Sequence, residues 1–300
     1  MKLRYVVAAP LLLLIIAGFS PQPCCADPEN VRIGLITDTH TTRERTGDEP
    51  LYEGHLEEVI SSINQADVEV VLAAGDLTQD GTTQQMSDFQ QQIKAFVRPV
   101  YVVPGNHDVG QKHNSGKQGE VTEDRVALYE QNFGLSYWSR SVSGIRIIGL
   151  NSSLLGSGLP EEGDQWAFLE NALAPSETQP TLIVMHYPLY LVSADEPGGT
   201  YWNVEPIPRA RLLNLIKQNG HVLAVLTGHL HRLLVNTTPE GTLLYSSPPV
   251  SFGLPKGKQQ EGWTLVTIDL TSDKVTTQFL PIPYLPINET SSIPPERDQD

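Results

Sequence analysis

The chain has 300 residues, of which 39% are hydrophobic and 18% are charged, so it is long and apolar enough to fold as a large globular domain. Its formal net charge is −15 at pH 7, and no cluster of lysine and arginine appears along it. This excludes the basic surface that nonspecific binding to nucleic acid requires, so no nucleic-acid partner is expected.

The first 26 residues have the order of parts found in a secretory signal peptide. Lys2 and Arg4 precede an apolar run of 14 residues, Val6–Phe19, which is followed by turn-forming residues and by Ala26. At about 1.5 Å per helical residue, this run falls short of a bilayer core of roughly 30 Å. We therefore predict cleavage after Ala26 and export to the periplasm or the extracellular space, with an uncleaved membrane anchor as the alternative.

Both cysteines, Cys24 and Cys25, lie inside this leader, so the mature protein is expected to contain no disulfide. A lipid anchor on either cysteine is disfavoured, because Gln22 and Pro23 stand where a lipidation signal has small and aliphatic residues. No second long apolar segment follows the leader, so any tie to a membrane would be confined to the N-terminal segment.

Residues 27–280 are expected to form one domain in which strands and helices alternate. Apolar runs with the length of buried strands are interspersed with segments that repeat apolar residues at helical spacing. In chain order, we expect a strand at 31–37, a helix at 54–66, a strand at 68–74, a helix at 82–96, a strand at 100–103, a helix at 125–132, a hairpin of 137–141 with 145–151, a helix at 164–173, a strand at 182–185, a helix at 209–218, and strands at 222–227, 242–246, 263–270 and 274–280. This order predicts an α/β sandwich with a mixed sheet. Residues 281–300 are rich in proline and polar residues, and they are expected to form a flexible tail.

Polar side chains of the kind that bind metals follow five of the predicted strands. Five of the eight histidines lie in these segments, together with two aspartates and one asparagine that are candidate ligands. In open α/β sheets, ligands bind outside the carboxyl ends of the strands, so these segments are expected to meet at one edge. Imidazole and carboxylate ligands without thiolate suit Zn, Mn or Fe. The glycines that precede several of these residues, Gly75, Gly105 and Gly228, permit sharp turns and close approach of the backbone.

These segments resemble the calcineurin-like metallophosphoesterases, in the same order and over roughly residues 31 to 232. The resemblance is carried by the blocks Asp38-Thr39-His40, Gly75-Asp76, Gly105-Asn106-His107-Asp108, His186 and Gly228-His229-Leu230-His231. It implies a four-layer α/β/β/α sandwich with mixed β-sheets. It also implies a centre of two divalent metal ions, Mn, Fe or Zn.

The resemblance assigns a role to each of these side chains. Asp38, His40 and His231 would hold the first metal, and Asp76 would bridge both metals. The second metal would be held by Asn106, His186 and His229.

Two further residues of the third block would act without binding metal. His107 would protonate the leaving oxygen or stabilise the charged transition state. Asp108 would orient His107 or cap the following turn.

The function implied is hydrolysis of small phosphodiesters by in-line attack of a metal-bridging hydroxide. The tyrosinate–iron form found in purple acid phosphatases is disfavoured, because Gln79 stands where those relatives have the iron-binding tyrosine. The sequence is more similar to the cyclic-nucleotide and glycerophosphodiester branch. A phosphomonoesterase acting on nucleotides or sugar phosphates is the alternative. An inactive scaffold of the same fold is a third reading, which the complete ligand set disfavours.

Several other residues are open candidates near the site. Asn151 and Ser152 follow a predicted strand, and Tyr187, Tyr190 and Trp202 flank His186 or the loop after it. The aromatic residues could stack on a base or sugar, although packing in the core or at the rim is the simpler interpretation. Arg209 and Arg211 could contact phosphate, although a solvated helix start is simpler.

Overall fold

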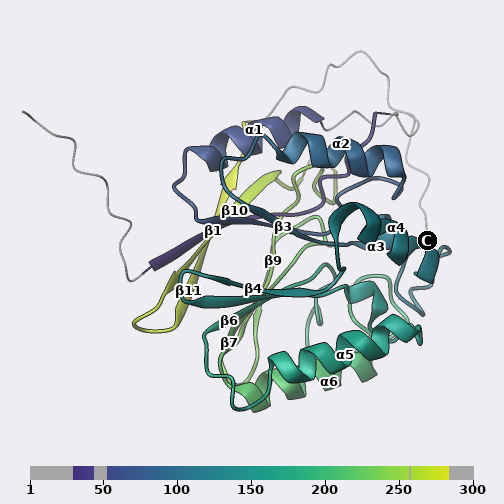
Figure 1. Ribbon diagram of the computed structural model, residues 1–300, viewed down its shortest axis with the longest axis vertical. Coiled ribbons are helices and arrows are strands. Elements are labelled where there is room, and N and C mark those ends of the chain that lie inside the picture. The colour runs from purple at the N-terminus through teal and green to yellow at the C-terminus, as the bar shows by residue number, and fades with distance from the viewer. Residues whose placement is uncertain (1–29, 44–52, 257, 284–300) are drawn as a thin grey trace, which may run out of the picture.

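The computed structural model describes residues 30–43, 53–256 and 258–283 (Figure 1). The predicted leader lies outside the described residues, and so does the predicted tail from residue 284 onward. The last strand of the described residues ends at Pro281, one residue past the predicted domain boundary. Pro281 pairs with Gly262 in the last strand, and the Ile282 N–H donates to the Glu261 carbonyl at 3.0 Å.

One sheet has five strands in the order β11-β10-β1-β2-β3. Strands β1, β2 and β3 run parallel, whereas β10 pairs antiparallel with both β1 and β11. The strands of this sheet are β1 (Asn30–Ile36), β2 (Val70–Ala74), β3 (Val100–Val103), β10 (Gly262–Asp269) and β11 (Lys274–Pro281).

The other sheet has six strands in the order β4-β5-β6-β7-β9-β8. Its four central strands are parallel, and the edge strands β4 and β8 pair antiparallel with their neighbours. The strands of this sheet are β4 (Trp138–Val142), β5 (Ile145–Gly149), β6 (Thr181–Val184), β7 (Val222–Thr227), β8 (Leu234–Thr237) and β9 (Leu243–Ser246).

Alternation of apolar side chains along the strands builds three core layers. On β2, Val70 and Leu72 point to the layer between the sheets, whereas Val71 and Ala73 point to the layer under the helices. Helices α1 (Glu53–Asn64), α2 (Thr83–Ile93) and α4 (Glu123–Phe133) belong with the first sheet, and α5 (Pro160–Ala172) and α6 (Pro206–Asn219) lie outside the second (Figure 1). The two sheets lie between the two helix layers, which confirms the predicted four-layer sandwich with mixed sheets.

Three short elements were not expected from the sequence. They are the strand β8, the four-residue helix α3 (Asn106–Val109) and a 3₁₀ helix at Ser152–Leu154. Each is too short to carry a periodic apolar pattern, and β8 is a partly exposed edge strand. Across the described ranges, no helix has both the length and the apolar character needed to cross a bilayer.

Parallel pairing places the ends of β1, β2 and β3 at one edge of the first sheet, and those of β6 and β7 at one edge of the second. The loops after these strands are joined by backbone hydrogen bonds. The Asp38 N–H donates to the Gly75 carbonyl at 3.0 Å, and the Gly228 N–H donates to the His186 carbonyl at 3.1 Å. The segment between β9 and β10 bonds to the loop after β1 here, because the Val250 N–H donates to the Thr37 carbonyl at 2.9 Å.

Candidate metal centre

Five of the seven predicted metal ligands have a left-handed backbone, a conformation that non-glycine residues rarely adopt. Such a conformation costs about 1–3 kcal/mol and persists where surrounding structure enforces it, as at functional sites. All five side chains are buried among the loops that follow strands of both sheets, a region we call the seam. The φ angles are 52° at Asp38, 46° at His40, 49° at Asp76, 70° at His229 and 51° at His231.

Two glycines allow the loops to approach as closely as they do. A Cβ atom at Gly105 would overlap the Asp76 carboxylate and its backbone nitrogen. A Cβ atom at Gly228 would overlap the Thr37 hydroxyl and lie 2.6 Å from Asp38 Oδ2. The role predicted for these glycines, close approach of the backbone, is therefore confirmed.

The first ligand group contains Asp38, His40, Asp76 and His231, and one ligand atom from each lies within 4.8 Å of the others. Nε2 of His231 lies 3.2 Å from Asp38 Oδ1 and 3.2 Å from Nε2 of His40. Nε2 of His40 lies 3.7 Å from Asp76 Oδ2. All four side chains are buried.

The second ligand group contains Asp76, His186 and His229, again with ligand atoms within 4.8 Å of one another. Nε2 of His186 lies 3.1 Å from Asp76 Oδ2, 3.2 Å from Nδ1 of His229 and 3.1 Å from Asn106 Oδ1. Asn106 is therefore beside this group, and Asp76 is shared by both groups. The structure thus brings all seven predicted ligands together, in the two sets expected, around one common carboxylate.

The hydrogen bonds around the four histidines test whether these groups suit metal ions. The ring nitrogen of each histidine that faces away from the groups lies beside an acceptor oxygen, so that nitrogen carries the hydrogen and the inward one presents a lone pair. Inward lone pairs only 3.2 Å apart repel unless a cation lies between them. Asp38 Oδ1 is also buried with no hydrogen-bond partner among the described residues. The donor set therefore fits two divalent ions. The outward contacts are His40 Nδ1 to Gln79 Oε1 at 2.9 Å, His186 Nδ1 to the Ala74 carbonyl at 2.8 Å, His231 Nδ1 to the Phe252 carbonyl at 2.5 Å and His229 Nε2 to the Tyr201 carbonyl at 3.1 Å.

The electrostatics of the centre keep its carboxylates ionised. Burial acts to raise the pKa of Asp38, but the neighbouring His231 and His186 outweigh it and lower that pKa to about 2. Burial also opposes ionisation of Asp76, whose pKa is nevertheless held well below its usual value by His186 and His107. The two carboxylates are therefore charged at neutral pH, as ligands of divalent ions must be.

His107 lies beside the ligand groups and belongs to neither. Its ring meets that of His40 edge to face, with 4.6 Å between the ring centroids. Its backbone N–H donates to Asp76 Oδ1 at 2.8 Å, and its Nδ1 lies 2.6 Å from the Gln79 carbonyl oxygen. With Nδ1 held in this way, Nε2 is the nitrogen available to exchange a proton with a substrate.

Asp108 does not orient His107, which corrects the first of the two roles expected for it. Its carboxylate accepts hydrogen bonds from the N–H groups of Gly105 at 2.8 Å, Leu77 at 3.1 Å and Thr78 at 2.9 Å, and from the Thr78 hydroxyl at 2.7 Å. Burial, and next the charge of Asp76, raise the pKa of Asp108 to about 6. Asp108 does not cap a following turn either: it accepts from Gly105, which precedes α3, and it ties the loop after β2 to the loop after β3.

Tyr187 and Tyr190 are buried in the core under α5 and α6, as the packing interpretation had it. The ring of Tyr187 also lies against that of His229, with 4.3 Å between the ring centroids. Arg209 was expected at a solvated helix start, but it is fully buried and lies 3.5 Å from Glu196. Arg211 is partly exposed, stacks on Trp166 at 4.3 Å and pairs with Glu170.

Three further residues support the site. The sequence analysis named Ser152 and Trp202 without assigning them this role, and it did not name Tyr201. The hydroxyl of Ser152 accepts the N–H groups of His186 at 3.2 Å and Tyr187 at 3.0 Å, and so fixes the start of that loop. Tyr201 lies against His229, with 4.6 Å between the ring centroids. Trp202 is 40% exposed, and its ring lies 5.9 Å from that of His229. Sequence position alone could indicate only that these residues follow a strand or flank His186.

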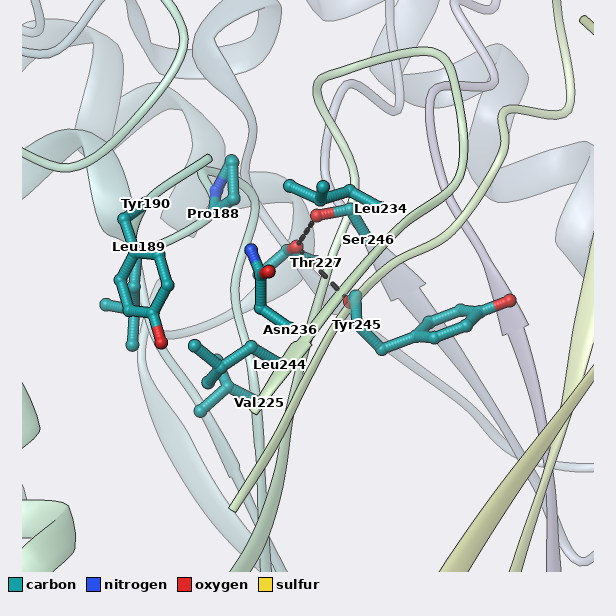
Figure 2. Close-up of a pocket in the computed structure, with 10 residues that line it drawn as sticks. All are labelled: Pro188, Leu189, Tyr190, Val225, Thr227, Leu234, Asn236, Leu244, Tyr245 and Ser246. Atoms are coloured by element: carbon teal, nitrogen blue, oxygen red, sulfur yellow. Dashed lines mark hydrogen bonds between the residues drawn. The ribbon is translucent and has the colours of Figure 1, made fainter. Parts of the chain in front are cut away.

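A small, mainly apolar hollow is lined by residues of β7, β8 and β9 and of the loop after β6 (Figure 2). Thr227 at its rim bonds Ser246 through their hydroxyls at 2.6 Å. No histidine, aspartate, glutamate or cysteine lines this hollow, so it offers none of the chemistry found at the seam. Its lining residues are Pro188, Leu189, Tyr190, Val225, Thr227, Leu234, Asn236, Leu244, Tyr245 and Ser246.

Comparison with known protein families identifies the group to which this arrangement belongs. The model of the calcineurin-like phosphoesterase family matches residues 31–233, which include both ligand groups. The chain belongs to this family. The solved structure of a dimetal phosphatase from Danio rerio shares the fold of this metallophosphoesterase, with a TM-score of 0.54 and 13% identity over 83% of this chain and 98% of that one.

Curated relatives of this metallophosphoesterase include both diesterases and a protein phosphatase. It is 34% identical over 175 residues to a probable glycerophosphodiester phosphodiesterase, GpdQ, of Arcobacter nitrofigilis, covering 57% of this chain and 58% of that protein. It is 27% identical to the human serine/threonine-protein phosphatase CPPED1, covering 66% of this chain and 61% of that one. It is 28% identical to the cyclic AMP phosphodiesterase CpdA of Escherichia coli, covering 70% of this chain and 72% of that one. The matched region thus spans about three fifths of the first two relatives.

Asp76→Asn is expected to lower bound metal from about two ions per chain to about one or fewer. The amide has no negative charge and only one oxygen, whereas the carboxylate that both ligand groups share has a charge and two oxygens. Metal content after reconstitution and gel filtration would measure this. Asp124→Asn, on the exposed first turn of α4, is the matched control. Two well-occupied ions in the Asp76→Asn protein would contradict the bridging role.

Proposed function

We propose that this metallophosphoesterase hydrolyses small phosphodiesters at a centre of two divalent ions, Mn, Fe or Zn. The observation that carries the proposal is the pair of histidine-rich ligand groups that share the buried Asp76 carboxylate, with His107 beside them. When bound, two such ions lower the pKa of water and neutralise charge on phosphoryl oxygens.

The residues of the chain then have distinct tasks in the reaction. Asp76 keeps the two ligand groups in register through contacts to both. In hydrolysis, a bond forms from phosphorus to the oxygen of water while the bond from phosphorus to the leaving oxygen breaks. The leaving oxygen gains the proton that Nε2 of His107 releases, and the water loses one proton to solvent, which later restores His107.

The charge around the site favours diesters over monoesters. A phosphodiester carries one negative charge, whereas a phosphomonoester carries up to two near neutral pH and gains more from extra cations. Two buried cations of the chain are already paired: Lys112 contacts Glu205, and Arg209 contacts Glu196. The net charge of −15 also penalises a doubly charged substrate. Similarity to GpdQ and CpdA supports the same preference.

A phosphomonoesterase is the second candidate. The similarity to human CPPED1, a serine/threonine-protein phosphatase, favours it, since the matched length in that comparison exceeds that in the GpdQ comparison. The ligand set would serve either reaction, because in-line displacement at phosphorus needs the same clamp in both.

We further propose that the protein is exported and acts on small phosphorylated molecules outside the cytoplasm, on the basis of the leader described by Lys2, Arg4 and the run Val6–Phe19. N-terminal sequencing of the protein from the periplasm or medium of a Gram-negative host should begin at Asp27. A full-length chain retained in the cytoplasm would overturn this.

His107→Ala is expected to retain both metal ions and to lose turnover by about 10²–10⁴-fold, the usual loss for a missing general acid. Metal analysis and kcat should be measured on the same preparation. His113→Ala provides the control, because His113 is exposed and pairs with Glu120 in a loop. Equal losses of metal and turnover would instead make His107 a ligand.

The preference for diesters is tested by reconstituting the protein separately with Mn, Fe and Zn and assaying two model substrates. We expect kcat/KM for bis-p-nitrophenyl phosphate to exceed that for p-nitrophenyl phosphate by about tenfold or more, which corresponds to about 1.4 kcal/mol or more of transition-state discrimination. A ratio in the opposite direction would favour the monoesterase. Hydrolysis of neither substrate with any metal would argue for an inactive scaffold.

A further inference from the structure

Tyr201 contacts two of the ligands assigned to the second metal. Its hydroxyl oxygen lies 3.2 Å from Nδ2 of Asn106, and its own carbonyl oxygen lies 3.1 Å from Nε2 of His229. Its ring also packs against that of His229. One residue of the loop between β6 and α6 therefore contacts both an amide and an imidazole of the same group.

The contact with Asn106 determines which end of that amide faces the ligand group. A side-chain amide has an oxygen that can bind a cation and a nitrogen that cannot, and the two ends have nearly the same shape. Oδ1 of Asn106 lies 3.1 Å from Nε2 of His186, so the oxygen points into the second group. The nitrogen points to Tyr201, whose hydroxyl oxygen accepts its hydrogen. Without that acceptor, nothing in this contact would favour one orientation over the other.

The hydroxyl of Tyr201 is itself held in place from the other side. The Gln111 amide forms a hydrogen bond with it, and Gln111 Oε1 accepts the hydroxyl of buried Tyr187 at 3.1 Å. The chain of contacts runs from the core through Gln111 and Tyr201 to Asn106.

The loop that carries Tyr201 is anchored near both of its ends by carboxylates paired with buried cations. Glu196 accepts the N–H groups of Leu191 and Val192, each at 2.8 Å, and pairs with Arg209. Glu205 accepts the Gly199 N–H at 3.1 Å and pairs with Lys112. These contacts hold the segment that carries Tyr201 at residues on either side of it.

We propose that Tyr201 is the positioning residue of the second metal site: its hydroxyl orients the Asn106 amide with the oxygen toward the metal, and its carbonyl orients His229. This inference rests on the two-metal centre of the proposed function. It assigns no contact with substrate to Tyr201. Outer partners of metal ligands commonly change metal affinity by about 10–100-fold, and an effect of that size is expected here.

The test is Tyr201→Phe, which removes the hydroxyl and keeps the ring against His229 and the carbonyl. Mn²⁺ is titrated into the metal-free full chain and followed by electron paramagnetic resonance, in which one ion gives a mononuclear signal and an adjacent pair gives a spin-coupled signal. We expect the mononuclear signal to appear as in wild type. The coupled signal should require about 10–100-fold more free Mn²⁺.

Tyr190→Phe is the matched control, because it also removes a phenolic hydroxyl from the loop between β6 and α6. That hydroxyl lies 3.5 Å from the Thr237 carbonyl, and Tyr190 lines the hollow between β7–β9 and the loop after β6 rather than contacting a proposed metal ligand. This variant should titrate as wild type does. A general weakening of the loop, by contrast, would affect both variants.

Two results would overturn the inference alone: a coupled signal at the wild-type Mn²⁺ concentration in Tyr201→Phe, or equal weakening of both sites. A wild-type chain that binds Mn²⁺ without ever giving a coupled signal would overturn the two-metal centre, and the inference with it. The titration contains no substrate, so failure of the proposed hydrolysis does not alter its outcome.

Discussion

The buried carboxylate of Asp76 is the element on which the rest of the centre depends. It lies 3.1 Å from His186 and 3.7 Å from His40, and it accepts the His107 N–H at 2.8 Å. One group of two oxygens thus contacts both halves of the ligand set and the residue proposed as the acid. A buried charge of this kind is expensive unless it is compensated, and the divalent ions that the donor set fits would supply the compensation.

Acceptor oxygens beside the outward ring nitrogens make the histidines suitable as ligands. Three of the four outward contacts are backbone carbonyls, those of Ala74, Tyr201 and Phe252, and the fourth is the Gln79 side chain. A backbone carbonyl cannot be removed by substitution, so most of these contacts depend on the loops holding their shape. Gln79 also contacts both a proposed metal ligand and the proposed acid, since its side chain contacts His40 and its carbonyl contacts His107.

The fold supplies the rigid frame that these loops require. Left-handed backbone at five ligands stores strain that an isolated loop would relieve. Here the loops follow buried strands of both sheets, and Asp108 ties two of them together through four hydrogen bonds. Backbone groups and the buried Asp108 carboxylate therefore keep these loops from relaxing. The proposed metal ligands lie where the loops of the two sheets meet.

The sequence by itself predicted every described strand except β8, most of the helices and the five segments that carry the candidate ligands, because these depend on short-range patterns. An apolar run has the length of a strand, a glycine precedes a sharp turn, and Asp38 and His40 stand two residues apart after β1. The element bounds differed from expectation by only a few residues. The family resemblance added the pairing of ligands into two sets, which spacing alone does not specify.

Only the tertiary structure decided which residues support the site. Tyr201 lies 95 residues from Asn106 along the chain, and Gln79 lies 39 from His40. The sequence suggested that Arg209 is a solvated helix residue, but in the fold it is buried beside the loop that carries Glu196. The role of Asp108 could not be assigned either, since its partners are backbone N–H groups that every residue possesses. Such contacts arise from where loops cross in space, and a local pattern of side chains carries no record of that crossing.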